Sequence, residues 1–362
     1  MSREKDRYSP DTPDRTSPAV SVSGTFLIAI LAFGIVATAM NPAIGESHGE
    51  AEIITGEWAA RYQRSYADGL LIQQPATHLW TLFQYRVFGE GQPGLLVGTD
   101  GWLFTDEEFT YYESADERIA RRLDFIVEVR DGLAERGAAL VVALVPAKAR
   151  VVSGRLGRYR YPDYARPRYD SFRRRLLERD VPAPDLARAL EAKGEEAFLR
   201  TDTHWTPAGA LAAAAALADE IDRTLESASA TRRSFVREER ETVRHEGELL
   251  TFLPLGPFME RFGPEPDTVG RFATSPRERR EAGLFEEVSI PITLVGTSYS
   301  AGELWDFAGA LQATASADVL NVSTEGEGPF VPMREYLDGE TLEESPPAVV
   351  VWEIPERYLP AP

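Results

Sequence analysis

Hydrophobic and polar positions divide this sequence into one isolated apolar segment near its start and a long region where apolar runs alternate with amphipathic stretches. The isolated segment is residues 20–40, VSVSGTFLIAILAFGIVATAM, which contain no charged side chain. At about 1.5 Å per residue, a helix of this length spans a bilayer core of roughly 30 Å. The segment therefore predicts membrane targeting, as an uncleaved anchor or as a signal peptide cut near residues 37–39.

The length of the apolar span favours the anchor, because the core of a signal peptide is shorter. Residues 1–19 form a polar leader in which four basic side chains are balanced by four acidic ones, so the charge signal for orientation is weak. No second apolar span follows. The pattern predicts a single-pass protein with a cytoplasmic leader at 1–19, a transmembrane signal anchor at 20–40 and the rest outside the cytoplasm.

The pattern after the anchor changes from one long amphipathic region to a regular alternation of elements. Aromatic residues recur at roughly helical spacing over 41–92 and predict a helical connecting segment. Two apolar runs around Thr99-Asp100-Gly101 predict a β-hairpin over 94–104. Helices are then expected over 115–136, 169–179, 185–193, 206–225 and 302–313, and strands over 138–145, 290–295, 319–322 and 348–352, with 198–202 a short strand or loop.

Helices between buried hydrophobic strands predict an α/β domain, a parallel sheet covered by helices on both faces, over residues 93–362. Residues 226–285 interrupt this pattern, because they are polar, rich in Arg and Glu and broken by Pro and Gly, so we expect loops and an insertion there. In parallel sheets, functional sites gather at the C-terminal ends of the strands. Residues that follow strands are therefore the candidates for chemistry.

Composition narrows the chemistry that those positions can perform. The net charge of −19 disfavours nucleic-acid binding, since phosphate contacts need a basic surface. The absence of cysteine excludes disulfides, thiolate metal sites and a cysteine nucleophile. With four histidines in the whole chain, a histidine-rich metal centre is not expected.

One candidate catalytic motif is Thr201–Pro207, in which Asp202 and His204 stand just before a helix that Thr206 can cap. In an acyl-transfer triad, an imidazole takes the proton of the nucleophile while a carboxylate holds its other nitrogen. An aspartate and a histidine on one loop can supply that pair. The alternatives are a capping aspartate beside a surface histidine, or metal ligation.

A second candidate motif is Gly296–Ser300, which follows an apolar strand and precedes a helix. Gly296 permits a tight turn that would present Ser298 at the end of the strand, among free backbone N–H groups that can stabilise an oxyanion. The alternative is an ordinary strand-to-helix turn with Ser298 as the N-cap.

Together these motifs resemble the alginate O-acetyltransferase family of the AlgJ and AlgX type, whose catalytic domain is SGNH-hydrolase-like. The resemblance extends over roughly residues 90–360. Five motifs match in the order of the family: Gly98–Phe104, Val145–Arg150, Thr201–Pro207, Gly296–Ser300 and Trp352–Leu359. Relative to ordinary SGNH hydrolases, the Asp-x-His motif precedes the serine motif, which is the permuted order of this family.

The resemblance implies a Ser298–His204–Asp202 triad, an acetyl-serine intermediate and transfer of acetyl groups to hydroxyls of an exported, alginate-like polysaccharide. It implies no cofactor, because a membrane-bound O-acyltransferase partner supplies the acetyl group, and it implies contacts with other polysaccharide-export subunits. The sequence stops soon after Leu359, without the carbohydrate-binding module of AlgX-type members. The layout is therefore similar to the AlgJ type, anchored in the inner membrane with its catalytic domain in the periplasm.

Residues near these motifs are candidates for substrate binding, although a packing role is at least as plausible for most of them. The stretch 150–179 also has ten arginines against three acids, net +7, and is interleaved with tyrosines. It predicts a contact with an anionic polysaccharide, or else arginines paired with acids elsewhere in the chain. The individual candidates are Lys148, Trp205, Tyr299, Arg357 and Tyr358.

Two other functions fit the same motifs. A carbohydrate acetylesterase of the same fold would use the same triad with water as the acceptor. A non-catalytic subunit of a polysaccharide acetylation or secretion complex would not need the intact Asp202, His204 and Ser298. The sequence leaves the polymer, the acetylated hydroxyl and the oligomeric state open.

Overall fold

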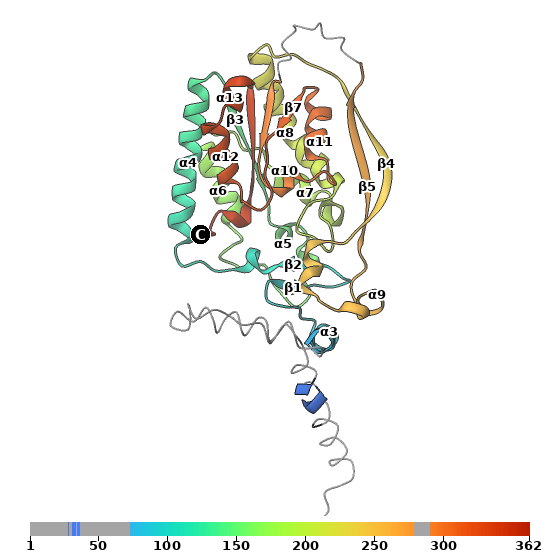
Figure 1. The fold of residues 1–362 in the computed structure, drawn as a ribbon. Helices are drawn as coiled ribbons and strands as arrows, with labels where there is room; N and C mark the ends of the chain where they lie inside the picture. Colours follow the sequence, from blue (N-terminus) through green and yellow to red (C-terminus); the bar gives the residue numbers. More distant parts are fainter. Residues whose placement is uncertain (1–27, 29–30, 34, 37–72, 279–289) are drawn as a thin grey trace, which may run out of the picture. The chain divides into compact units, whose positions relative to one another are not determined.

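The chain divides into two units, residues 1–80 and 81–362. The second unit holds a parallel sheet, its covering helices and two two-stranded antiparallel ribbons (Figure 1). The computed structural model describes residues 28, 31–33, 35–36, 73–278 and 290–362.

The structure tests the predictions for residues 1–92 mainly from residue 73 onward. No helix in the described ranges is long and apolar enough to cross a membrane. The predicted span at 20–40 lies almost entirely outside those ranges, so the anchor stays a prediction. Helix α3 (Gln73–Phe83) and a π-helical turn (Gln84–Phe88) agree with the helical expectation for the end of the connecting segment.

The expected hairpin opens the domain. Strand β1 (Leu95–Val97) pairs antiparallel with β2 (Leu103–Thr105). Asp100 and Gly101 in the connecting turn both have positive φ, a conformation that Gly and Asp adopt more readily than most other residues. The hairpin is confirmed, and β2 is fully buried.

The central sheet contains four parallel strands in the order β3-β8-β6-β7. Strands β3, β6 and β8 are almost wholly buried on both faces and mainly apolar, as expected for a sheet covered by helices on each side. All four strands agree with the sequence prediction to within a few residues. Their bounds are Ala139–Val145 for β3, Ile292–Val295 for β6, Val319–Asn321 for β7 and Val349–Pro355 for β8.

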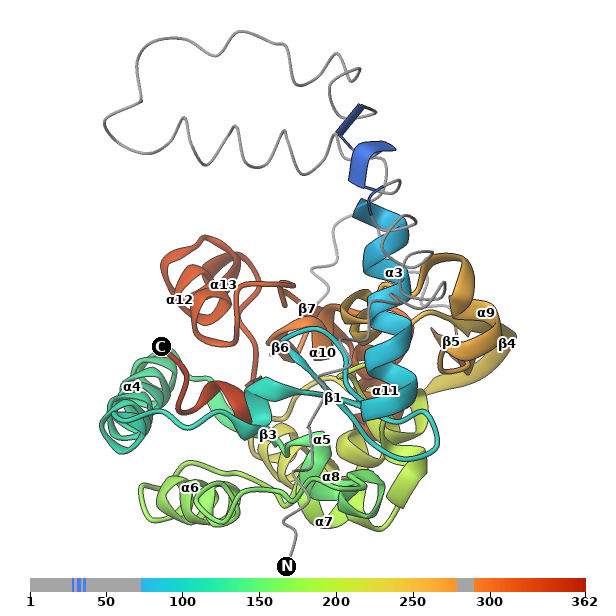
Figure 2. The same cartoon turned by 90° about the horizontal axis from the view of Figure 1, so that it is seen from below.

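Helices cover both faces of the sheet, and each face has its own core (Figures 1 and 2). Alternate residues of β3 enter each core, which is the two-residue periodicity of a strand. One face packs against α4 (Ala115–Glu135), α6 (Arg168–Leu177), α12 (Phe330–Asp338) and α13 (Thr341–Glu344), and the other against α7 (Leu186–Glu191), α8 (Pro207–Ser227) and α11 (Phe307–Ala315).

The expectation of loops over 226–285 is wrong for much of that segment. Strands β4 (Phe235–His245) and β5 (Asp267–Pro276) form a long antiparallel ribbon at the edge of the domain (Figure 1). Most residues of β4 are exposed or half-exposed, so its sequence lacks the apolar alternation that identifies a strand. Its pairing with β5, more than twenty residues further on, holds it in place.

The helix expected over 302–313 also begins later than predicted. A single turn, α10 (Ser298–Ala301), comes first, and Asp306 in the left-handed region separates it from α11. Helices α12 and α13 were not predicted. The remaining short elements are α5 (Lys148–Val151), α9 (Met259–Phe262) and 3-10 turns at 106–109, 153–155, 194–197, 248–252, 256–258 and 356–358.

Candidate active site

Ser298 is presented by a tight turn at the C-terminal end of β6. Thr297 caps the turn, because its hydroxyl accepts a hydrogen bond from the backbone N–H of Tyr299 at 3.3 Å. Gly296 is needed here, since a Cβ at this position would lie 2.5 Å from the carboxylate of Glu353. Within residues 291–300 every side chain is buried except that of Ser298, which is half-exposed. The turn therefore exposes one hydroxyl at the edge of the sheet.

His204 and Asp202 lie in the loop that leads into α8. Thr206 caps that helix by accepting from the N–H of Gly209 at 3.0 Å, and Pro207 occupies its first turn, as the sequence predicts. The loop turns back on itself through a bridge between Phe198 and Trp205. These local signals fix the position of the loop beside the nucleophile turn.

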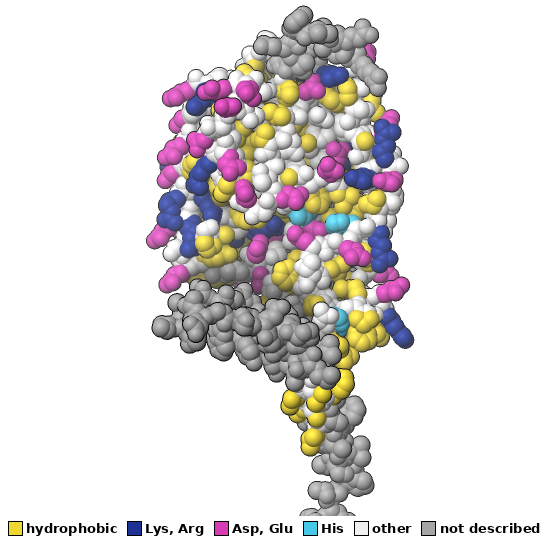
Figure 3. Space-filling view, viewed as in Figure 1, with side chains coloured by type: hydrophobic (Ala, Val, Ile, Leu, Met, Phe, Trp, Pro, Cys, Tyr) yellow, Lys and Arg dark blue, Asp and Glu magenta, His cyan; other side chains and the backbone are white. Residues whose placement is uncertain are grey.

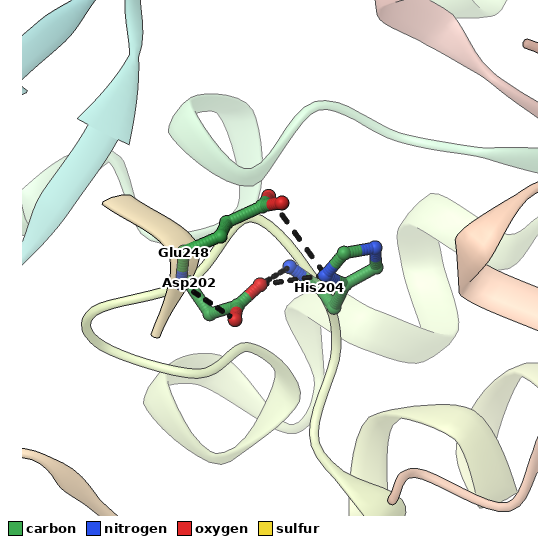
Figure 4. Close-up of side chains that lie close together, drawn as sticks. All are labelled: Asp202, His204 and Glu248. Carbon is green, nitrogen blue, oxygen red and sulfur yellow. Dashed lines mark hydrogen bonds and ion pairs between the residues drawn. The ribbon is translucent and has the colours of Figure 1, made fainter. Parts of the chain in front are cut away.

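The three predicted catalytic residues are brought together by these two loops. Nε2 of His204 lies 2.7 Å from Oγ of Ser298, and Nδ1 of His204 lies 2.6 Å from Oδ1 of Asp202 (Figure 4 shows the Asp202 side). An ionised carboxylate only accepts hydrogen bonds, so Nδ1 carries the hydrogen and Nε2 is free to accept from the serine hydroxyl. This is the geometry that a general base requires before it takes up a proton.

Asp202 is held as an anion by an unusually complete set of donors. Burial alone would raise the pKa of its carboxyl, but hydrogen bonds from His204 and His245 hold that pKa well below its usual range. Nε2 of His245 donates to Oδ2 at 2.8 Å, and the backbone N–H groups of His204 and Glu248 donate at 3.1 Å each. His245 was not a predicted site residue, because it lies 43 residues along the chain in a segment expected to be loop.

Glu248 adds a second carboxylate near the imidazole of His204 (Figure 4). Its Oε1 lies 3.9 Å from Nδ1 and accepts a hydrogen bond from the hydroxyl of Thr203. Ligand-type atoms of Asp202, His204 and Glu248 thus fall within 4.8 Å of one another. The 2.6 Å contact between Nδ1 and Oδ1 is a hydrogen bond, too short for two atoms that each lie about 2.0–2.2 Å from one tetrahedral metal ion. The arrangement fits the triad and does not fit a metal site.

Trp305 is a further residue of the site that the sequence motifs did not reveal. Its indole stacks on the His204 imidazole with a centroid separation of 4.2 Å and an interplanar angle of 12°. Its Nε1 donates to the backbone carbonyl of Ser298 at 3.1 Å. One side chain therefore contacts both the general base and the nucleophile, and it is 7% exposed.

Glu353 supports the nucleophile turn from beneath. Its fully buried carboxylate accepts from the N–H of Thr297 at 2.7 Å, from the Thr297 hydroxyl at 2.9 Å and from the Ser300 hydroxyl at 3.1 Å. Burial raises the pKa of Glu353 to about 7, although these hydrogen bonds lower it. The residue lies on β8, so the neighbouring strand fixes the turn that follows β6.

Three predicted substrate-binding residues are buried, and the structure corrects their direct role. Nζ of Lys148 donates to the carbonyls of Leu103, Arg200 and Asp202 at 2.6, 3.1 and 2.8 Å, so all its donors are used inside the protein. Trp205 is fully buried and its Nε1 donates to the carbonyl of Tyr299 at 3.1 Å. The Tyr299 hydroxyl in turn donates to the carbonyl of Thr203 at 2.6 Å. These side chains hold the two catalytic loops together.

The other two candidates differ from each other. Arg357 is also buried. It forms an ion pair with Glu107 at 3.2 Å and donates to the Tyr299 hydroxyl at 3.4 Å, so its polar contacts lie within the protein. Tyr358 is half-exposed and lines a groove of about 590 Å³ between α4, α12 and the loop before α12. Of the five candidates, Tyr358 alone is both half-exposed and in a groove.

The structure pairs four of the ten arginines in the basic stretch 150–179 with carboxylates. Arg150 pairs with Glu356 at 2.7 Å, and Arg155, Arg158 and Arg166 also pair with carboxylates. The other six form no ion pair within the described residues, so the alternative of paired arginines holds for part of the stretch and the polysaccharide contact stays a prediction.

A second group of arginines lies around the groove that Tyr358 lines. Basic and acidic side chains are interspersed over α4 at the left of Figure 3. Arg118, Arg121 and Arg122 of α4 and Arg334 of α12 line the groove, and none of the four forms an ion pair within the described residues. Burial and the three neighbouring guanidinium groups lower the pKa of Arg122 to about 10. Four guanidinium groups and one carboxylate, that of Glu327, therefore line this groove in a strongly acidic protein.

The parallel sheet and the hydrogen-bonded Ser-His-Asp set at its C-terminal edge define an SGNH-hydrolase-like domain. Residues 95–356 match the family described as "SGNH hydrolase-like domain, acetyltransferase AlgX". The chain belongs to this acetyltransferase family. It is 38% identical to the probable alginate O-acetylase AlgJ of Azotobacter vinelandii over 344 residues, which cover 93% of this chain and 88% of the relative. It is 40% identical to the same protein of Pseudomonas putida over 314 residues, covering 85% and 81%.

Two solved structures share the fold. The O-acetyltransferase domain of Pseudomonas putida AlgJ superposes with a TM-score of 0.67 at 41% identity, covering 75% of this chain and 94% of that domain. Pseudomonas aeruginosa AlgX superposes with a TM-score of 0.57 at 24% identity, covering 72% of this chain and 61% of AlgX. The predicted SGNH-hydrolase-like fold is confirmed.

Proposed function

We propose that this protein acetylates hydroxyl groups of an exported, alginate-like polysaccharide through an acetyl-Ser298 intermediate. The observation that carries the proposal is the continuous hydrogen-bonded series from Asp202 through His204 to the half-exposed Ser298 hydroxyl. Relatives of this chain named as probable alginate O-acetylases support the reaction and the acceptor.

In the first step, Oγ of Ser298 attacks the carbonyl carbon of an acetyl ester while Nε2 of His204 takes the serine proton. The tetrahedral intermediate needs a donor for its oxyanion. In the nucleophile turn, the N–H groups of Thr297 and Tyr299 are already bonded, whereas that of Ser298 has no partner among the described residues. The Ser298 N–H is therefore available to the oxyanion. Collapse returns the proton from His204 to the leaving alcohol and leaves acetyl-Ser298.

In the second step, a sugar hydroxyl attacks the acetyl-serine carbonyl. His204 removes the hydroxyl proton as the new ester bond forms and passes that proton to Oγ as the Ser298 ester breaks. Asp202 stabilises the imidazolium in both steps. Water in place of the sugar would give acetate, so the acceptor that reaches acetyl-Ser298 decides between transferase and esterase.

The donor and the cellular setting complete the proposal. We assign supply of the acetyl group to a membrane-bound O-acyltransferase partner, together with other polysaccharide-export subunits, and no cofactor to the reaction itself. The charge-free segment 20–40 supports single-pass anchoring in the inner membrane, with the catalytic domain in the periplasm. The reaction in this setting uses an acetyl ester and a polymer hydroxyl.

For an acidic acceptor, we assign the groove lined by Tyr358, in which four arginines outnumber one glutamate. Arg118, Arg121, Arg122 and Arg334 offer planar donors that match carboxylates, and their mutual repulsion is relieved when an anion binds. A larger cavity of about 900 Å³ opens beside Glu248, but four glutamates and one arginine line it, so it would repel a uronate.

Mass spectrometry tests the proposal directly. The purified full-length chain is incubated with an activated acetyl ester and with uronic-acid or neutral oligosaccharides. Acetyl on the Ser298 peptide and on the oligosaccharide is expected, and Ser298→Ala should abolish both. Ser227→Ala, at the exposed end of α8, is the matched control and should change neither. Acetate as the sole product would show an esterase, and an unlabelled Ser298 would favour a non-catalytic subunit.

A further inference from the structure

Asp202 is shared by two imidazoles, and only one of them belongs to the proposed triad. Oδ1 accepts from Nδ1 of His204 at 2.6 Å, whereas Oδ2 accepts from Nε2 of His245 at 2.8 Å. His245 is the last residue of β4, and its side chain is 24% exposed. The ribbon at the edge of the domain therefore delivers a side chain to the catalytic centre.

The residues after His245 also contact Asp202. The N–H of Glu248 donates to Oδ2 at 3.1 Å, so His245 and Glu248 hold the same carboxylate oxygen. Gly247 between them contacts Thr201 so closely that a Cβ would lie 2.1 Å from the Thr201 carbonyl oxygen. Only glycine allows this approach, so the turn after β4 is fitted to the loop that carries Asp202.

We infer that His245 is a positioning residue, which orients Asp202 toward His204 and, when protonated, opposes the protonation of His204. One carboxylate compensates one positive charge, so two imidazolium ions on Asp202 repel each other. The inference rests on the proposed function for its kinetic readout, because His204 must be neutral to accept the Ser298 proton.

The charges around His245 favour its protonated form. Asp202 faces it from the catalytic loop, Glu248 from the 3-10 turn after β4, and Asp267 from the paired residue on β5. The hydrogen bond to Asp202 raises the pKa of His245 above its usual value, against the effect of partial burial. As the pH falls, His245 therefore becomes charged early, and its positive charge opposes a second one on the other imidazole bonded to Asp202.

His245→Gln and His245→Leu separate the two effects. Glutamine keeps an N–H donor for Oδ2 but does not titrate, and leucine provides neither function. With glutamine, we expect kcat at alkaline pH to remain within about threefold of wild type, while the acid limb of kcat/KM moves up by about one pH unit, the size of a coupled titration. With leucine, kcat at alkaline pH should fall about tenfold, because Oδ2 loses a charge-assisted hydrogen bond. His78→Gln, in α3, removes an imidazole from another element and should change neither quantity.

Nuclear magnetic resonance of the imidazole nitrogens makes the result independent of turnover. The chain has four histidines, so each signal can be assigned by single substitution. The signals of His204 should titrate at higher pH in full-length His245→Gln than in wild type. An unchanged or lower midpoint, or equal kcat for the glutamine and leucine variants, overturns the inference. If Ser298 is never acetylated but the midpoint shifts as expected, the proposed function fails and the coupling stands.

Discussion

Replacing Lys148 with methionine is expected to destabilise the protein and slow catalysis without weakening substrate binding. The ammonium donates to three carbonyl oxygens, but that of Arg200 also accepts from the N–H of Leu103 at 2.9 Å, so methionine leaves two acceptors unpaired at about 1–3 kcal/mol each. Burying the ammonium has its own cost, because burial lowers the pKa of Lys148 to about 7, and methionine removes that cost. The low end for the two carbonyls gives a gross loss of about 2 kcal/mol, which the removed burial cost reduces.

Denaturant and thermal unfolding measure that loss. For a domain of this size a loss of up to about 2 kcal/mol corresponds to a Tm lower by up to about 8 °C. Since Asp202 loses the anchor of its backbone carbonyl, kcat should fall about tenfold while KM stays unchanged. Lys193→Met is the control: Lys193 is exposed, and its replacement should change stability by less than about 0.5 kcal/mol. A Lys148→Met variant of wild-type stability with a raised KM would refute the reasoning and support direct substrate contact.

Three other predictions concern Trp305, Glu353 and the arginines of the groove. Trp305→Phe keeps a stacked ring but loses the donor to Ser298, so kcat should fall less than in Trp305→Leu; equal values for both variants and wild type would contradict this. The pKa of Glu353 is raised to about 7, so the folded state retains a proton that the unfolded state releases above about pH 4.5; stability should fall by about 3 kcal/mol as pH rises to 7, and urea midpoints should lack this slope in Glu353→Gln. Arg121→Gln with Arg334→Gln should reduce acetyl transfer to uronic-acid oligosaccharides at low salt and leave neutral acceptors unaffected, and equal losses for both acceptors would disprove an anion groove.

Elements with local signals were predictable from the sequence. The apolar run of β3 indicates a strand buried on both faces, and Thr206 with Pro207 marks the start of α8. The ribbon of β4 and β5 carries no such signal, because most of its side chains meet solvent on both faces and its stability comes from pairing over a distance in sequence. The alternation of apolar and polar residues identifies a strand only when one of its faces is buried, and neither face of this ribbon is fully buried.

The residues of the site also divide into those with a local sequence signal and those without one. Asp202, His204 and Ser298 were predictable because each motif combines a reactive side chain with a strand end or a helix cap next to it in sequence. His245 and Trp305 contact Asp202 and His204, which lie far from them in the sequence. No motif next to His245 or Trp305 indicates these contacts.

Position after a strand does not separate residues that react from residues that support them. Lys148 follows β3 as Ser298 follows β6, and both positions lie at the C-terminal edge of the sheet. That edge needs buried donors and acceptors, because the turns leaving the strands carry backbone groups that no neighbouring strand satisfies. Lys148 donates to the carbonyls of Leu103, Arg200 and Asp202 and is 1% exposed, whereas Ser298 is half-exposed. Exposure of the reacting atom, which the sequence does not encode locally, is therefore what distinguishes a candidate nucleophile from its scaffold.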